Sequence, residues 1–86
     1  MNKYFVYILK CADESLYTGI ATDIQRRLDE HNNSDKGAKY TRARRPVNLL
    51  YSEEFPNRSE AQKREYFLKQ LTKSQKIDLI NLDKNH

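Results

Sequence analysis

An arginine and a histidine stand where a surface helix usually places apolar side chains. The stretch DIQRRLDEH begins at Asp23, and steps of three and four residues from Ile24 reach Arg27, Leu28 and His31. Such a stripe faces the core of a surface helix. A guanidinium can pair with phosphate oxygens and an imidazole can move a proton. A structural role is equally compatible, with Arg27 at the rim of the stripe and His31 hydrogen-bonded near the helix end.

Two tyrosines stand on neighbouring segments close to the amino end. Tyr7 and Tyr17 belong to short runs of β-branched and aromatic residues, which predict the two strands of an antiparallel hairpin. A turn centred near Ala12 makes Tyr7 and Tyr17 direct cross-strand partners, whereas a shift of one residue puts them on opposite faces. Gly19 within the second strand predicts a bulge or a close backbone approach. Such phenols can position a proton, although strand tyrosines most often serve only in packing.

A carboxylate lies on or beside the apolar stripe of a later predicted helix. Ala61, Glu65 and Leu68 follow one another in steps of four and three residues. Glu65 can therefore hold a divalent cation, or it can be a rim residue paired with one of the many basic side chains. Two phenols, an arginine, a histidine and a carboxylate together form a set that can hydrolyse a phosphodiester.

The elements that must position these side chains follow from the pattern of the chain. Strands are predicted at 4–9, 16–20 and 47–55, the third being more central than edge at Leu49–Tyr51. Helices are predicted at 23–33, 59–71 and 73–82. The order ββαβαα predicts an α+β fold, a three-stranded antiparallel-type sheet flanked by helices.

Two details of the later helices are also predicted. Ser59 and Gln62 have the spacing of a capping box at the start of the second helix. The third helix is expected to be shorter and to bury Ile77, then Leu79 or Ile80, and Leu82.

Length and composition agree with a single domain over residues 1–86. A chain of 86 residues leaves no room for two cores. Its net charge of +4 and pI near 9.3 favour a polyanion as partner. The single cysteine, Cys11, excludes an internal disulfide and a paired-cysteine metal site. The chain lacks a signal-peptide pattern and an apolar run near the roughly 20 residues that span a bilayer, so a cytoplasmic location is expected.

With these motifs in place, the sequence resembles the GIY-YIG nuclease domain, in particular the small stand-alone bacterial proteins that consist of little else. The two signature triplets of that family match Val6–Ile8 and Tyr17–Gly19. The hallmark arginine and histidine of the family fall on Arg27 and His31, and its metal-binding glutamate on Glu65. Val6 stands where the family name has glycine. The resemblance covers the chain from about residue 4 to residue 79.

The resemblance implies an endonuclease that uses one divalent cation. Glu65 would hold Mg²⁺ or Mn²⁺ on the scissile phosphate. Tyr17 would activate the attacking water and Tyr7 would orient it, although these two roles could be exchanged. Arg27 would stabilise charge on the phosphoryl oxygens, and His31 would position or shuttle a proton. Several relatives place a lysine directly after the second triplet, where this chain has Ile20.

The segment KYTRARRP is the expected substrate contact. Its basic and aromatic side chains suit a phosphate backbone and base stacking, and they are Lys39, Tyr40, Arg42, Arg44 and Arg45. The alternative is a solvated charged loop. The sequence contains no element typical of base-sequence reading, so little intrinsic specificity, or specificity supplied by a protein partner, is expected.

Three function classes follow from the sequence. The first is an endonuclease acting on nucleic acid, with DNA favoured over RNA. The others are a module that binds nucleic acid without cleaving it, and a protein-interaction domain that retains a relic site. Metal-dependent cleavage distinguishes the first class from both others, and salt-dependent binding to nucleic acid distinguishes the second from the third.

Overall fold

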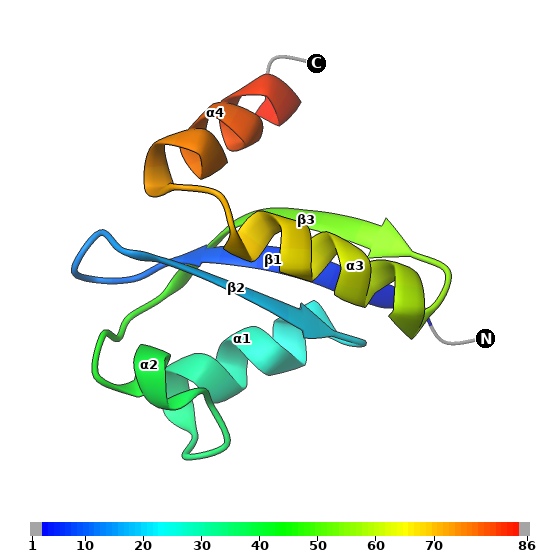
Figure 1. The fold of residues 1–86 in the computed structure, drawn as a ribbon. Helices are drawn as coiled ribbons and strands as arrows, with labels where there is room; N and C mark the ends of the chain where they lie inside the picture. The colour runs from blue at the N-terminus through cyan, green and yellow to red at the C-terminus, as the bar shows by residue number, and fades with distance from the viewer. Residues whose placement is uncertain (1–2, 85–86) are drawn as a thin grey trace.

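The computed structural model describes residues 3–84, which form a three-stranded sheet with helices on both faces (Figure 1). The strands are β1 (Tyr4–Lys10), β2 (Leu16–Ala21) and β3 (Asn48–Phe55). The helices are α1 (Ile24–Asn33), α2 (Lys39–Arg42), α3 (Arg58–Lys69) and α4 (Lys73–Lys84). The expected α+β class and the ββαβαα order of the longer elements are confirmed. The four-residue helix α2 is additional and lies in the segment expected to be a loop.

The sheet has the strand order β2-β1-β3, and both pairings are antiparallel. The central strand β1 is buried from Val6 to Leu9, because helices cover the sheet on both sides. Strand β3 lies at an edge, so the expectation that Leu49–Tyr51 is central was wrong. An apolar run indicates that side chains are buried, but it does not report how many strands pair with the backbone.

The register of the β1–β2 hairpin differs from the expected one by two residues. Tyr7 pairs with Gly19, and Tyr17 pairs with Leu9. Direct pairing of Tyr7 with Tyr17 was therefore wrong. Because side chains alternate between faces with a period of two residues, both phenols still lie on the same face.

The two faces of the sheet carry separate cores. On the face covered by α3 and α4, the buried cluster includes Val6, Ile8, Tyr51, Ala61, Leu68 and Ile80. On the face covered by α1, it includes Tyr7, Leu9, Cys11 and Val47. In Figure 1, α1 and α2 lie together on one side of the sheet, and α3 crosses the other side. This division places α1, β1 and β2 around a shared site.

The starts of the later helices differ from the expected capping box at Ser59 and Gln62. Asn57 caps α3, because its side chain accepts a hydrogen bond of 2.9 Å from the backbone N–H three residues on. The reciprocal arrangement occurs instead at α4. There the Gln75 side chain accepts from Thr72 N–H at 2.9 Å, and Thr72 Oγ1 accepts from Gln75 N–H at 3.1 Å.

Helix α4 is as long as α3, with 12 residues in each, so the expectation of a shorter helix was wrong. Ile80 is buried and Leu79 is half-buried, as expected for an inward stripe. Ile77 and Leu82 are 38% and 63% exposed, because α4 lies at one end of the sheet and covers little of it (Figure 1). Within the part of the chain that the structure describes, no helix has the length and apolar character needed to cross a membrane.

Candidate active site

His31 is the centre of the candidate site. It is fully buried under the sheet, at the last turn of α1, a helix whose start is capped by the Asp23 side chain. Its Nε2 atom lies 2.9 Å from the Tyr7 hydroxyl and its Nδ1 atom lies 2.8 Å from Thr41 Oγ1. The inward stripe of α1 therefore ends on a histidine whose two ring nitrogens both have partners.

The surroundings of His31 favour its neutral form. Burial and, to a lesser extent, the positive charges of Arg27 and Arg45 together lower the pKa of His31 to about 4, while Glu30 acts in the opposite direction. A neutral imidazole has one N–H donor and one acceptor nitrogen. His31 can therefore accept a proton at neutral pH.

Tyr7 lies against the backbone of its cross-strand partner, Gly19. A Cβ atom at position 19 would lie 2.6 Å from Tyr7 Cζ, so any larger residue would push the phenol away. The close backbone approach expected at Gly19 is therefore confirmed. The exposed fraction of Tyr7 is only 2%. Burial, together with Tyr17 and Glu65 and opposed by Arg27, raises the pKa of Tyr7 to about 12.

Tyr17 lies half-buried beside these two side chains. Its ring centroid is 6.5 Å from that of Tyr7, 5.3 Å from that of His31 and 6.0 Å from that of Tyr40. Four aromatic rings contributed by β1, β2, α1 and α2 are thus gathered at one side of the sheet. Tyr17 separates the buried Tyr7 from the exposed Tyr40.

Arg27 lies at the rim, with 29% of its side chain exposed. Its Nη1 atom donates to Glu30 Oε1 and to the Lys36 carbonyl, both at 2.9 Å. Arg27, Glu30 and Ile20 line a pocket of about 220 Å³ between the end of β2 and the start of α1, together with Ala21, Thr22, Asp23 and Arg26. Ile20, the residue after the second triplet, therefore lies in the pocket that Arg27 lines.

Glu65 lies on α3, and its negative charge contributes to the raised pKa of Tyr7. Its side chain is 22% exposed and forms an ion pair of 3.1 Å with Lys69. Residues 3–84 contain no group of three or more His, Cys, Asp or Glu side chains placed to hold a metal ion. A single carboxylate suits Mg²⁺, which commonly binds through one or two carboxylates, substrate phosphate and retained waters. This donor set fits a cation held jointly by the protein and its substrate.

The basic residues of the KYTRARRP segment divide into two groups. Lys39 and Arg42 are exposed on α2, and Tyr40 beside them is 39% exposed. Arg44 instead donates to Asp13 Oδ2 at 3.0 Å and to the Tyr40 carbonyl at 2.9 Å. Its guanidinium also lies 3.9 Å from the centre of the Tyr40 ring. Arg44 therefore holds this segment against the β1–β2 turn.

Arg45 turns away from solvent towards the end of α1. Its guanidinium donates to the backbone carbonyls of Glu30, His31 and Ser34. These carbonyls lie at the end of α1, and those of Glu30 and Ser34 also accept from the backbone N–H groups of Ser34 and Gly37. The contacts give Arg45 a structural role at the helix end and fix the position of His31.

Thr41 is a site residue that sequence reasoning missed. It is fully buried, although it lies within a segment expected to be exposed, and its hydroxyl contacts His31. A threonine among five basic or aromatic neighbours has no sequence pattern that distinguishes it from a solvated residue. Its contact with His31 exists only because α2 folds back on α1 (Figure 1).

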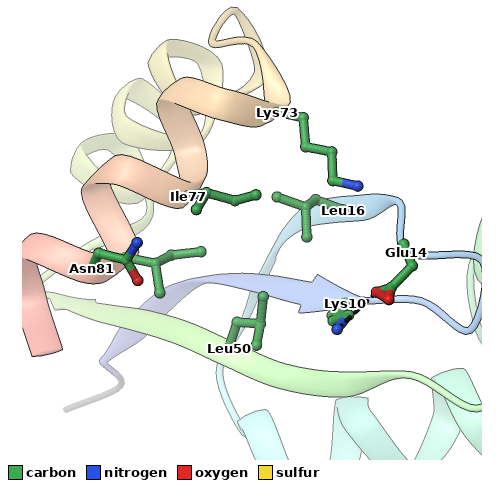
Figure 2. A pocket seen from close by; sticks show the side chains of 8 residues that line it. Lys10, Glu14, Leu16, Leu50, Lys73, Ile77 and Asn81 are labelled. Carbon is green, nitrogen blue, oxygen red and sulfur yellow. Dashed lines mark ion pairs between the residues drawn. The ribbon is translucent and has the colours of Figure 1, made fainter.

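A larger pocket lies elsewhere. A pocket of about 450 Å³ is lined by Leu16 and Leu50 of the sheet and by Ile77 and Ile80 of α4, with Lys73 at its edge. Figure 2 shows α4 above these strand residues. Leu16 and Leu50 pack with the α3–α4 core, so this pocket and Tyr7 lie on opposite faces of the sheet.

Comparisons with known proteins agree with this geometry. The family model described as "GIY-YIG catalytic domain" matches residues 3–78. The UPF0213 protein DP2720 of Desulfotalea psychrophila is 60% identical over 77 residues, covering 90% of this chain and 70% of that protein. The UPF0213 protein SERP0126 of Staphylococcus epidermidis is 56% identical over 80 residues, covering 93% of this chain and 96% of that protein.

Solved structures show the same fold. The solution structure of the protein EF2693 from E. faecalis has a TM-score of 0.69 and 41% identity, covering all of this chain and 91% of that one. The solution structure of the UPF0213 protein BH0048 from Bacillus halodurans has a TM-score of 0.60 and 46% identity, covering 93% of this chain and 84% of that one. One conclusion follows from the match to the domain model and from the arrangement of the site residues Tyr7, Tyr17, Arg27, His31 and Glu65. The chain belongs to the GIY-YIG catalytic domain family, among its small UPF0213-type members.

Proposed function

We propose that this chain is a metal-dependent endonuclease that hydrolyses phosphodiester bonds in nucleic acid, with DNA as the first substrate to test. The supporting observation is that the other expected site residues converge on Tyr7. His31 is hydrogen-bonded to it, the Tyr17 ring lies beside it, and the charges of Arg27 and Glu65 both act on its pKa. A proton acceptor, a cation for phosphate and a metal-binding carboxylate thus surround one phenol.

Of the two phenols, Tyr7 is the better candidate to activate water. With a pKa of about 12, Tyr7 keeps its proton at neutral pH and is not ionised. Its hydroxyl lies 2.9 Å from Nε2 of His31, so it can accept a proton from water while its own proton passes to His31. Tyr17, half-buried next to it, would then orient the water.

Hydrolysis of the phosphodiester involves the following changes in bonds and protons. The water oxygen bonds to phosphorus as one ester oxygen departs, and the proton released by water reaches the Tyr7 oxygen. The Tyr7 proton converts His31 to an imidazolium, and the departing oxygen takes a proton from solvent. The pair is reset when His31 returns its proton to the Tyr7 oxygen and Tyr7 releases the proton received from water to solvent. The negative charge of a bound phosphate favours the imidazolium and offsets the low pKa of free His31.

Arg27 and Glu65 would act on the phosphate itself. A guanidinium has five donors, and the bonds from Arg27 to Glu30 and Lys36 both use Nη1, so its remaining donors can pair with phosphoryl oxygens. Glu65 would hold Mg²⁺ or Mn²⁺, which supplies charge neutralisation at the phosphoryl oxygens. The ion pair between Glu65 and Lys69 would open when the cation binds.

The exposed side chains of α2 would hold the nucleic acid. Lys39 and Arg42 can bind backbone phosphates, and Tyr40 presents part of its ring to solvent for stacking. Arg44 and Arg45 would support this surface rather than contact the substrate.

A protein partner would supply sequence or structure specificity. The single buried cysteine, Cys11, suits a reducing compartment such as the cytoplasm.

The test is cleavage of labelled single-stranded, duplex and branched DNA and RNA, with Mg²⁺ or Mn²⁺ and with EDTA. Glu65→Gln should abolish cleavage, and Tyr7→Phe should lower its rate about 10²- to 10⁴-fold. Glu60→Gln is the matched control on the same helix as Glu65, because Glu60 is exposed and pairs with Lys63. Salt-dependent binding without metal-dependent cleavage would replace the proposal with a binding module. Neither binding nor cleavage by folded protein would favour a protein-interaction domain.

A further inference from the structure

Thr41 has two hydrogen-bond partners, and they restrict where its proton can lie. Thr41 Oγ1 lies 2.9 Å from the Ala38 carbonyl oxygen and 2.8 Å from Nδ1 of His31. A carbonyl oxygen can only accept, so a Thr41 hydroxyl that donates to Ala38 accepts from His31. In this arrangement His31 carries its proton on Nδ1, and its Nε2 lone pair faces Tyr7.

We propose that Thr41 is a positioning residue that holds His31 in the Nδ1–H tautomer, so that Nε2 is free to receive the proton of Tyr7. The contribution to catalysis rests on the proposed nuclease function. The tautomer itself does not, because it follows from hydrogen-bond geometry in the free protein. Thr41 acts only through His31.

The opposite tautomer has weaker support in the same contacts. It requires the Ala38 N–H to donate to His31 Nδ1, and this separation is 3.4 Å, the longest of the set. It also requires Thr41 to turn its proton from the Ala38 carbonyl to His31. Nε2–H would then donate to the Tyr7 oxygen, and the imidazole would have no lone pair for the Tyr7 proton.

The fold fixes Thr41 from several sides. The backbone N–H groups of Thr41 and Arg42 both donate to the Ala38 carbonyl at 3.1 Å, which forms the first turn of α2. A Cβ atom at Gly37 would lie 2.8 Å from His31 Cα, so only glycine allows the chain to pass this close to α1. The four-residue helix α2 thus places one buried hydroxyl against His31.

The tautomer can be measured without any activity. Long-range ¹H–¹⁵N spectra of the full chain distinguish a protonated ring nitrogen from an unprotonated one. The chain has two histidines, so a His86→Ala variant assigns the signals. The Nδ1–H form of His31 at pH 7 is the expected result. The Nε2–H form in the wild-type protein would overturn the proposal.

Two substitutions test the role of the hydroxyl. Thr41→Val keeps the shape but removes the hydroxyl, and it should shift His31 towards Nε2–H, where the Tyr7 oxygen is still available as an acceptor. Thr41→Ser keeps the hydroxyl and should keep the wild-type tautomer. Thr18→Val is the matched control, because Thr18 is also buried and its hydroxyl has no hydrogen-bond partner within residues 3–84.

Kinetics then measure the catalytic contribution. Thr41→Val should lower kcat about 10- to 100-fold at unchanged KM, the range typical when a partner that orients a functional imidazole is removed. Thr41→Ser should restore most of the rate. Unchanged His31 spectra in folded Thr41→Val would overturn the positioning role. If the wild-type protein shows the expected tautomer but cleaves nothing, the nuclease proposal fails and the structural assignment stands.

Discussion

Tyr7 lies across Gly19, its direct partner in the β1–β2 hairpin, so closely that a Cβ atom at position 19 would come within 2.6 Å of Tyr7 Cζ. The absence of a side chain at Gly19 is what allows the phenol to lie this close to the backbone of β2. From this position its hydroxyl contacts His31 of α1 at 2.9 Å. One glycine thus permits the contact on which the proposed proton transfer depends.

Gly19→Ala should displace Tyr7 and destabilise the protein. The added methyl group overlaps the phenol, and overpacking in a filled core costs typically about 1–3 kcal/mol. Chemical denaturation of Gly19→Ala, Tyr7→Ala and the double variant measures the coupling. The double variant should lose less stability than the sum of the single changes, because the clash is absent once the phenol is gone. Strict additivity would contradict a direct contact.

Tyr7→Phe and Tyr17→Phe should differ in their effect on cleavage. Of these two tyrosines, Tyr7 is the one whose hydroxyl is hydrogen-bonded to the imidazole of His31. Tyr7→Phe should therefore lower kcat about 10²- to 10⁴-fold, the usual contribution of a proton-transfer group. Tyr17→Phe should lower it less, since the ring and its packing remain. Single-turnover rates at saturating substrate provide the comparison. A larger loss in Tyr17→Phe would reverse the two roles.

His31 should make the fold sensitive to mild acid. Its pKa falls from 6.5 to about 4 on folding, so between these values the unfolded chain binds more protons than the native protein. Stability from this group is therefore fully present above about pH 6.5 and is lost as pH falls towards 4. The loss should reach roughly 2–3 kcal/mol, since one pKa unit corresponds to about 1.4 kcal/mol.

Urea denaturation at pH 7.5, 5.5 and 4.5 tests this dependence, with His31→Asn as the reference. The wild-type protein should lose stability more steeply than the variant over this range. The charged groups that set the pKa of His31 are Arg27, Arg45 and Glu30. Parallel profiles for the two proteins would show that His31 is not buried in its neutral form.

Lys39→Ala and Arg42→Ala should weaken nucleic-acid binding without unfolding the chain. Each lost phosphate contact should reduce the slope of log K against log salt by about 0.9 for duplex DNA. Lys73→Ala is the matched control, because Lys73 lies beside the pocket on the opposite face of the sheet (Figure 2). Fluorescence anisotropy at several salt concentrations gives the slopes. An equal effect of Lys73→Ala would indicate non-specific charge attraction.

Arg45→Ala should affect stability rather than the salt slope. It removes one donor from each of three carbonyls at the end of α1, and the carbonyls of Glu30 and Ser34 keep a backbone N–H partner. The cost therefore falls on the His31 carbonyl, at about 1–3 kcal/mol for an unsatisfied buried group. Thermal unfolding and the anisotropy titration should therefore separate Arg45 from Lys39 and Arg42. A reduced salt slope with unchanged stability would instead place Arg45 in the substrate contact.

The sequence by itself determined the elements and the identities of most candidate site residues. Apolar runs and steps of three and four residues identified the strands, the longer helices and the inward positions of Arg27, His31 and Glu65, because side-chain periodicity is a local property of the backbone. The spacing of the triplets and of these polar residues also indicated the family. These signals needed no knowledge of which elements pack together.

The tertiary structure decided everything that depends on contacts between distant segments. The hairpin register, the edge position of β3 and the placement of α2 against α1 result from competition among pairings that the sequence pattern leaves nearly equal. For the same reason, only the fold shows that Arg45 supports α1, whereas Lys39 faces solvent. Thr41 became a site residue solely because α2 brings its hydroxyl within 2.8 Å of His31, ten residues earlier in the chain.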